Sequence, residues 1–329
     1  MIRKIIFLII SLSLPCITQA NDVVVSIKPI YALVTQIMAG VDKPTLLLTG
    51  KESPHTYTLK PSQVQELHQA KLVIWVSPFV EGFLAKTLST LENTRVLQLS
   101  TLPDLTLLPI RVGGAWEKHV HHHDEDEHEH KDDVGEAQEK HVHHDEDAHE
   151  HENDFEMQVD GHIWLDPHNA MLIVRAITQA LSVMDTSHAM LYQANAEKVL
   201  QRLDELDKQL KTTLAPVQDV PYVVFHDAYQ YFERHYNLNA VGSITLSPEN
   251  PPSAKRLSEL RERMRTLQVH CVFSEPQFEP KLVNTLIEGT SIKQDVLDPE
   301  GANLNADENA YSILLTNLAQ TLQGCLQDK

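Results

Sequence analysis

Short β-branched segments alternate with amphipathic helical segments along most of this chain, and this alternation constrains the fold more than any other feature. Residues 23–27 (VVVSI) predict a strand, residues 29–40 predict a helix with one apolar face, and residues 45–48 (TLLL) predict the next strand. The same alternation returns between residues 222 and 297. Because parallel strands need a crossover segment between them, we expect an α/β fold with mainly parallel sheets flanked by helices.

A long helical pattern separates the two alternating regions. Its leucines recur three or four residues apart on one helix face, at Leu203, Leu206, Leu210 and Leu214. At ~1.5 Å per residue such a helix is ~40 Å long, which suits a rigid connection between two lobes. We therefore predict an N-terminal lobe at residues 21–185, a linking helix at 186–215 and a C-terminal lobe at 216–329.

The first twenty residues have the pattern of a cleavable secretory signal. Arg3 and Lys4 precede a short apolar run, and small residues lead to a predicted cut after Ala20. A retained anchor helix is the alternative, but the run is shorter than the ~20 apolar residues of a membrane span. No later apolar run is that long, so we expect an exported mature protein that does not span a membrane.

Two cysteines, Cys271 and Cys325, remain after removal of the signal, which contains Cys16. An even pair in an oxidising compartment favours one disulfide. Two buried free thiols are the alternative.

A histidine- and acid-rich tract at about 117–156 interrupts the N-terminal lobe. It is a tandem duplication, because EKHVHHHDEDEHEH at 117–130 recurs as EKHVHHDEDAHEH at 139–151. Without an apolar period it cannot bury enough surface to offset its ordering entropy, so we expect a disordered loop. The net charge of −19 and the lack of a basic region argue against nucleic acid as a partner.

The histidines of this tract predict weak metal binding of loose stoichiometry, with a simple solvated charge run as the alternative. They are His119, His121, His122, His123, His128, His130, His141, His143, His144, His149 and His151.

Candidate metal ligands outside the tract follow predicted strands. His55 comes after residues 45–48, and His226, Glu275 and Asp298 come after three later strands, while His162 opens the segment that follows the tract. Ligand groups of open parallel sheets gather beyond the carboxyl ends of the strands. Imidazole suits zinc, copper, nickel and iron, whereas manganese and calcium prefer oxygen. Three imidazoles with a water or carboxylate are a common zinc arrangement.

Seven segments of the chain, in order, resemble the zinc-specific periplasmic solute-binding proteins of ABC importers. They are SIKPIYALV, SPHTYTLKPSQ, LVIWVSPFVEGFL, HIWLDP, VVFHDAYQYF, VFSEPQF and LDPEG. The resemblance covers nearly all of the mature chain and includes the histidine-rich insertion. It implies two α/β lobes joined by a rigid long helix, with metal bound between the lobes, and a disulfide at Cys271 and Cys325.

The resemblance implies His55, His162 and His226 as the metal ligands. Manganese-specific relatives have a glutamate where His226 stands, so the imidazole favours zinc, although such a site also accepts copper or cadmium. Asp298 matches an aspartate ligand of the manganese-type relatives and is the candidate fourth ligand, with water as the alternative. Pro54 stands where some zinc-specific relatives have a glutamate ligand.

Two acidic residues are candidates to support the ligands: Glu275, which follows a predicted strand, and Asp227, which directly follows His226. We expect them to accept hydrogen bonds from ligating imidazoles, because such imidazoles usually donate their second N–H to an acceptor.

These features together predict a monomeric, non-enzymatic periplasmic protein that captures Zn²⁺ and delivers it to the permease of an ABC importer with its cytoplasmic ATPase. A zinc-dependent hydrolase with three histidine ligands is one alternative, although the chain has no HExxH motif. An extracellular zinc buffer or adhesion factor is another.

Overall fold

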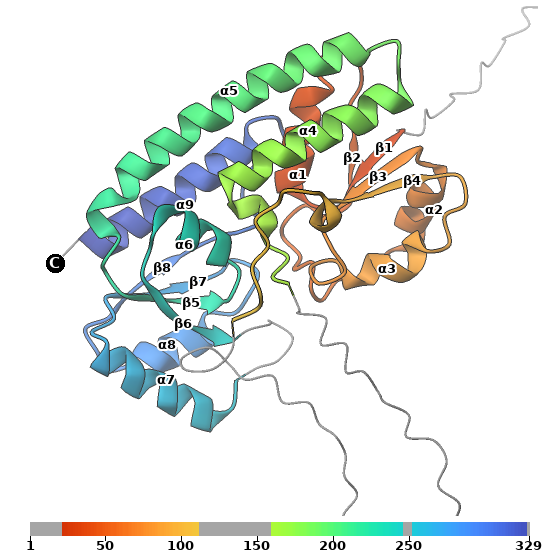
Figure 1. The fold of residues 1–329 in the computed structure, drawn as a ribbon. Helices are drawn as coiled ribbons and strands as arrows, with labels where there is room; N and C mark the ends of the chain where they lie inside the picture. The colour runs from red at the N-terminus through yellow and green to blue at the C-terminus, as the bar shows by residue number, and fades with distance from the viewer. Residues whose placement is uncertain (1–21, 112–158, 246–251, 328–329) are drawn as a thin grey trace, which may run out of the picture. The chain divides into compact units, whose positions relative to one another are not determined.

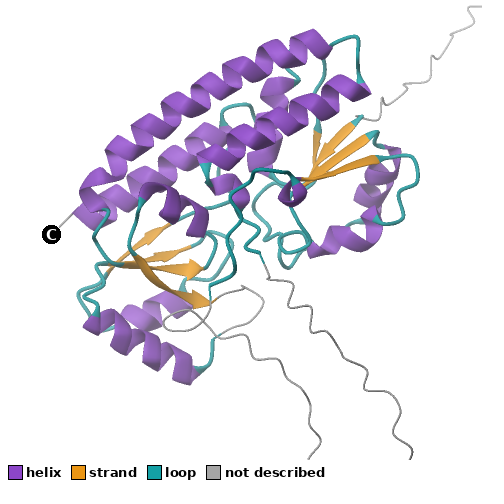
Figure 2. Cartoon of the chain, in the orientation of Figure 1, coloured by secondary structure: helices purple, strands orange, loops and turns teal. Residues whose placement is uncertain are grey.

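The computed structural model describes residues 22–111, 159–245 and 252–327. The predicted signal at 1–20 and the tract at about 117–156 lie outside these residues. The described chain forms two compact units, each with its own four-stranded sheet (Figures 1 and 2). The first unit comprises Met1–Asp104, Pro167–Lys208 and Glu300–Thr316, and the second unit comprises Leu105–Asp166, Gln209–Pro299 and Asn317–Lys329.

The sheet of the first unit has four parallel strands in the order β2-β1-β3-β4. Alternate side chains of its central strands face opposite sides, and on one side Val24, Val73 and Trp75 pack against Leu67 and Leu84 of two helices. The elements are β1 (Val23–Val25), α1 (Lys28–Ile37), β2 (Thr45–Leu46), α2 (Pro61–Gln69), β3 (Leu72–Trp75), α3 (Gly82–Leu88), β4 (Arg95–Gln98), η1 (Leu99–Thr101) and α4 (Pro167–Met184).

The segment PFVEGFLAKTL at residues 78–88 has the sequence pattern of a helix, but its N-terminal end is not helical in the structure. Only Gly82–Leu88 is helical, because Glu81 has a non-helical backbone conformation and its side chain folds back toward the end of β3. The carboxylate accepts hydrogen bonds from the main-chain N–H groups of Val76 and Ser77. A buried acidic side chain thus replaces the first turn that the sequence pattern predicts.

The sheet of the second unit is also wholly parallel, in the order β6-β5-β7-β8. Val223, Phe225 and Val272 of its central strands pack against Leu260 of α7 and Leu286 of α8. The elements are η2 (Ile163–Leu165), β5 (Tyr222–His226), α6 (Gln230–Tyr236), β6 (Ala240–Thr245), α7 (Ala254–Thr266), β7 (Cys271–Ser274), α8 (Lys281–Ile287) and β8 (Lys293–Val296).

A disulfide joins Cys271 at the start of β7 to Cys325 in α9 (Ala310–Gln327), with the two Cα atoms 6.3 Å apart. It confirms the predicted pairing and excludes two free thiols. The bond ties the C-terminal helix to a buried strand of the second unit.

The long helix is α5 (Ala189–Leu214), followed directly by η3 (Ala215–Val217). It lies between the two sheets along the chain, and its buried residues recur three or four apart: Tyr192, Ala196, Val199, Leu203, Leu206, Leu210 and Leu214. The division between the units falls within both α5 and α9. The predicted α/β class, with two parallel sheets and one long helix, is confirmed.

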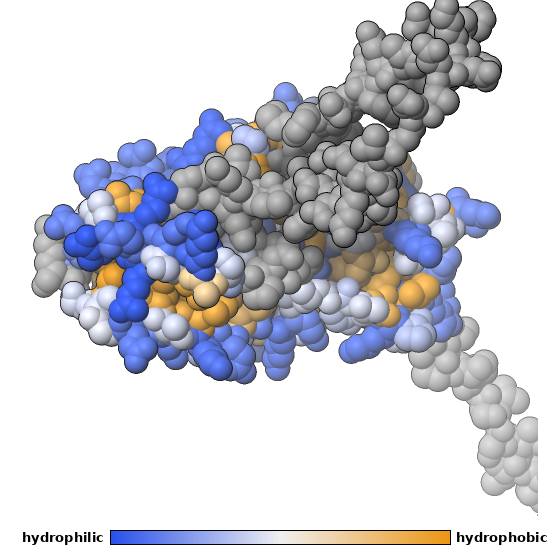
Figure 3. Space-filling model, turned by 90° about the horizontal axis from the view of Figure 1, so that it is seen from below, coloured by the Kyte–Doolittle hydropathy of each residue, from blue (hydrophilic) through white to orange (hydrophobic). Residues whose placement is uncertain are grey.

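The apolar residues of both units lie mainly in the two cores. Figure 3 shows one face of the molecule, on which hydrophilic side chains predominate over the described surface and hydrophobic ones form smaller groups. None of the helices in the described part of the chain combines the length and apolar character needed to cross a membrane.

Candidate metal centre

His162 is fixed by an acidic residue two positions before it. It directly precedes the short helix η2, and its side chain is 3% exposed. The Asp160 carboxylate accepts a hydrogen bond from the main-chain N–H of His162 at 3.0 Å, and the same oxygen lies 2.7 Å from the ring atom Nδ1. Burial raises the pKa of Asp160 to about 7. Once ionised, its carboxylate only accepts, so this contact then places the ring proton on Nδ1 and leaves the lone pair on Nε2.

His226 is fixed in the same way by a residue from the neighbouring strand. It is the last residue of β5, and Glu275 directly follows β7. The two carboxylate oxygens of Glu275 lie 2.6 Å and 2.7 Å from Nδ1 of His226. Glu275 is fully buried and His226 nearly so, and again Nε2 is the nitrogen that remains available to a ligand.

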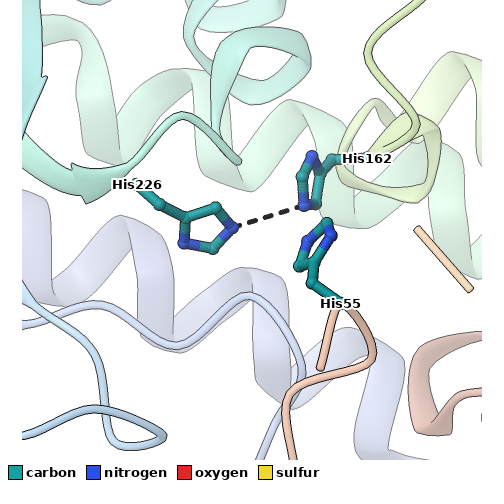
Figure 4. A group of neighbouring side chains, drawn as sticks. All are labelled: His55, His162 and His226. Carbon is teal, nitrogen blue, oxygen red and sulfur yellow. Dashed lines mark hydrogen bonds between the residues drawn. The ribbon is translucent and has the colours of Figure 1, made fainter. Parts of the chain in front are cut away.

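The two Nε2 atoms face each other at 3.4 Å, as Figure 4 shows for His162 and His226. Two lone pairs at this distance repel each other unless a proton or a cation lies between them. Two nitrogens that each bind a tetrahedral zinc ion at 2.0–2.1 Å lie ~3.3–3.4 Å apart. The separation in the histidine pair, by which we mean His162 and His226, therefore matches two corners of a zinc tetrahedron.

The two imidazoles differ in proton affinity. Burial, together with the nearby His226, lowers the pKa of His162 well below its usual range. Burial also acts to lower the pKa of His226, but nearby carboxylates, mainly that of Glu275, together outweigh it and raise this pKa above the ordinary value. At neutral pH the pair therefore takes up at most one proton, on His226, and His162 stays ready to bind a cation.

Aromatic side chains surround the histidine pair within the second unit. Trp164 lies beside His162 with ring centroids 5.3 Å apart, and Phe278 lies edge-on to His226 at 6.3 Å. Tyr229 is fully buried near the same ring, at 6.5 Å. These rings exclude water, which strengthens electrostatic interactions between the imidazoles and a bound cation.

Arg111 pairs with two acidic residues near His226. Its guanidinium makes a bidentate contact with Asp227, with Nε 3.1 Å and 3.0 Å from the two carboxylate oxygens, and Nη1 donates to Glu233 at 2.7 Å. Burial raises the pKa of Glu233 to about 7 despite the opposing effect of Arg111, and burial likewise raises the pKa of Asp227. The guanidinium thus supplies the positive charge that these buried carboxylates require.

The structure gathers some of the predicted site residues and places others elsewhere. It brings His162, His226 and Glu275 together, whereas the Asp227 carboxylate is held by Arg111. Asp298 follows β8, and its Oδ1 accepts a hydrogen bond from Nε2 of Gln277 at 3.3 Å. These residues all belong to the second unit.

His55 belongs to the first unit, where it lies between β2 and α2. Its half-buried ring is edge-on to Phe79, with centroids 6.1 Å apart. Its role as a ligand stays a prediction, and the eleven histidines of the tract lie outside the described residues.

Sequence reasoning missed Asp160 and Arg111. Asp160 is hidden at the end of an acid-rich stretch, and only its position two residues before His162 distinguishes it from its neighbours. Arg111 is separated from Asp227 by more than a hundred residues, so no local pattern links them. Asp160 now takes the role toward His162 that Glu275 takes toward His226.

Two α/β units with parallel sheets, one of which holds a buried pair of carboxylate-supported imidazoles, define a class of two-unit α/β proteins with a candidate site for a divalent metal. The family described as zinc-uptake complex component A, periplasmic (ZnuA), matches residues 23–325, and the chain belongs to this family. The resemblance carried by the seven sequence segments is thereby confirmed. The family is named for uptake and not for an enzymatic reaction.

Named relatives agree with this assignment. The chain is 43% identical over 309 residues to the high-affinity zinc uptake system protein ZnuA of Brucella abortus, covering 94% of this chain and 92% of the relative. It is 35% identical to the protein of the same name from Yersinia pestis, over 93% of this chain and 91% of the relative. A crystal structure of ZnuA matches in fold with a TM-score of 0.71 at 23% identity, covering 93% of this chain and 99% of that one.

Proposed function

We propose that this chain binds Zn²⁺ with high affinity and delivers it to a membrane importer of the ABC type. The observation that carries the proposal is the histidine pair, whose Nε2 atoms lie 3.4 Å apart while a buried carboxylate fixes each Nδ1. This arrangement presents two lone pairs at the spacing of zinc ligands, in surroundings that exclude water. The names of the relatives, which describe zinc uptake, support the same metal.

We further propose that His55 joins His162 and His226 as the third ligand of a single zinc ion. Three neutral imidazoles suit a borderline-soft divalent ion better than they suit manganese or calcium. Asp298 or a water molecule completes the tetrahedron. The zinc ion is the cargo of the protein, so the site must bind it tightly in one step and release it in another.

The histidine-rich tract is proposed to bind further zinc weakly. Its eleven imidazoles lie among carboxylates, and a segment that must be ordered on binding has a low affinity. Its function in this proposal is to raise the local zinc concentration near the tight site.

The proposal places the mature protein in the periplasm as a monomer that interacts with a permease and its ATPase. The N-terminal pattern predicts export, and the family is described as periplasmic. A hydrolase is not favoured, because zinc hydrolases commonly use a nearby acidic residue as a general base toward the bound water. In the second unit the two acidic residues nearest the histidine pair, Asp160 and Glu275, are both engaged by Nδ1 atoms.

Two complementary variants test the proposal. In the first, His55, His162 and His226 are all replaced by alanine and the tract is left intact. In the second, residues 117–154 are deleted and the three histidines are kept. Zinc titration against a strong competing chelator measures the tight site, and calorimetry at higher zinc concentrations measures the weak ones.

The first variant is expected to lose the one tightly bound zinc ion and keep the weak sites, and the second is expected to do the reverse. One tight zinc ion retained by the triple-alanine variant would contradict the proposed function. Loss of the tight site on deletion of the tract would show that the tract is the main site.

A further inference from the structure

The two chain segments that flank the tract lie side by side in the second unit. Pro109 and Val159 form an antiparallel bridge, and the main-chain N–H of Asp160 donates to the carbonyl of Leu108 at 2.9 Å. The 47 residues from 112 to 158 therefore leave and re-enter the described structure at neighbouring points. His162 lies only two residues beyond Asp160.

Two side chains of α6 hold these segments together. The hydroxyl of Tyr231 accepts a hydrogen bond from the N–H of Leu108 at 3.1 Å and donates to the carbonyl of Asp160 at 2.6 Å, so it bridges both segments. Gln230 donates from Nε2 to the carbonyl of Pro109 at 3.0 Å. The side chain of Tyr231 is buried, which protects these hydrogen bonds from water.

Arg111 adds an ionic contact at the last described residue before the tract. It binds two buried acidic residues: Asp227, which precedes α6, and Glu233, which lies within α6. We call Arg111, Gln230 and Tyr231, with the groups they bind, the clasp. Two groups of the clasp adjoin the histidine pair, because Asp227 directly follows His226 and Asp160 orients His162.

The segment 112–158, which contains the tract, is long, and its length disfavours the contact between its two ends that the clasp maintains. The sequence predicts a loop without packed structure for most of these 47 residues. For a flexible loop the probability that the ends meet falls as the −3/2 power of length, so such ends meet ~40-fold less often than those of a four-residue loop. Separation of the ends would pull on Asp160, and Asp160 fixes the ring of His162.

We infer that Arg111 and Tyr231 are positioning residues for zinc binding: they hold the base of the tract closed, so that its long chain does not displace Asp160 and the histidine pair. The inference rests on the proposed function, because the histidine pair must bind zinc for its position to matter. If the inference is correct, the effect of the clasp on zinc affinity depends on the length of the segment between residues 111 and 159. A purely local packing role would not depend on that length.

The experiment is a double-mutant cycle between the clasp and the tract. Tyr231→Phe and Arg111→Gln are each made in the full-length chain and in a chain whose residues 112–158 are replaced by a four-residue Gly-Ser-Gly-Ser link. Zinc affinity is measured by competition with a chelator at substoichiometric zinc, which leaves weak sites empty. Tyr192→Phe and Arg256→Gln are matched controls, because they remove a hydroxyl that donates to Asp185 and a guanidinium that donates to the Ser243 carbonyl.

In the full-length chain, Tyr231→Phe is expected to weaken zinc binding at least ~5-fold, because it removes two buried hydrogen bonds that each contribute about 1 kcal/mol. Arg111→Gln is expected to weaken it further, up to the ~40-fold limit that loop length sets. With the short link, both variants should bind within about twofold of their own parent chain, because the ends then need little help to meet. The control substitutions should leave zinc affinity unchanged in both chains.

Two results would overturn the inference: clasp variants that bind zinc like the full-length parent, or variants that lose as much affinity with the short link as without it. Tyr231→Phe keeps the experiment decisive if Arg111→Gln leaves its buried carboxylates unpaired and fails to fold. His162→Ala is the reference for the proposed function. If His162→Ala binds zinc with normal affinity, the proposed function is wrong. If His162→Ala loses zinc affinity while the clasp variants keep it, only the inference about the clasp is wrong.

Discussion

The two sheets share one strand order, so the same position can be compared in both. β1 and β5 are equivalent, as are β3 and β7. At the end of β5, His226 meets the Glu275 carboxylate that follows β7. At the end of β1, the hydroxyl of Ser26 donates at 2.5 Å to Glu81, which follows β3.

The two buried carboxylates have different partners. Glu81 accepts from Ser26 and from the main-chain N–H groups of Val76 and Ser77, so its oxygens are all engaged by groups of the protein itself. Burial raises its pKa to about 7 even though these hydrogen bonds oppose the shift. Glu275 instead holds one side of an imidazole whose other nitrogen remains available to a ligand. A buried acidic residue at this sheet edge therefore has a structural role in both units. In the second unit its contact with the imidazole of His226 makes it part of the candidate binding site.

Alanine at the two equivalent strand ends should separate these roles most clearly. His226→Ala removes one zinc ligand and is expected to weaken zinc binding by on the order of 100-fold or more, since metal affinity is shared among few ligands. Ser26→Ala removes one hydrogen bond to Glu81 and should leave zinc affinity within about twofold, while lowering the free energy of unfolding by about 1 kcal/mol. Chelator competition and urea unfolding measure the two quantities. Equal zinc affinities in both variants would remove the distinction between the strand ends.

Glutamine at the two buried carboxylates gives a smaller effect with the same contrast. Glu275→Gln keeps the shape but removes the charge that orients His226, and we expect zinc affinity to fall ~10-fold, the lower end of the usual effect of such support. Glu81→Gln places an N–H₂ group against main-chain N–H donors and should lower the free energy of unfolding by about 1–3 kcal/mol. Its zinc affinity should not change. The contrast fails if Glu275→Gln affects stability alone.

The parts of the fold that depend on local pattern could be predicted from the sequence. The β-branched runs place β1, β3, β5 and β7, and their spacing requires helices between parallel strands, so His226 and Glu275 could be assigned to strand ends. The disulfide between Cys271 and Cys325 followed from the cysteine count and from the family resemblance.

The parts that depend on long-range contacts could not be predicted. Asp160 supports His162 only because the chain re-enters beside Leu108, and Arg111 reaches Asp227 across more than a hundred residues. Likewise the late start of α3 depends on Glu81 folding back onto the end of β3, which helix periodicity does not encode. The support of His162, the pairing of Arg111 and the start of α3 thus depend on buried charged groups, which the pattern of apolar residues does not reveal.

Acidification should act in opposite directions on the two strand ends. Zinc competes with protons for imidazole nitrogen, and Glu275 raises the pKa of His226, so zinc affinity should begin to fall at a higher pH than it would for an ordinary histidine. Because the pKa of His162 is lowered, the histidine pair should contribute one proton to this fall, from His226, or about tenfold per pH unit. An affinity that stays flat from pH 7.5 to 5 would contradict a site built on this pair.

Glu81 should give the smallest and opposite effect, in the stability of the zinc-free protein. Its pKa is raised to about 7 in the folded state from a usual value of 4.5, so between these values the folded state binds the proton more tightly than the unfolded state. Its contribution to the free energy of unfolding therefore rises as the pH falls from above 7 toward 4.5. The pKa values of Asp160 and Glu233 are also raised to about 7, so these groups change the stability over the same pH range. The contribution of Glu81 is therefore measured as the difference in free energy of unfolding between the wild type and Glu81→Gln. Between pH 7.5 and 5.5 the wild type should gain about 2 kcal/mol relative to Glu81→Gln in urea unfolding, and parallel pH profiles would show that Glu81 does not titrate in this range.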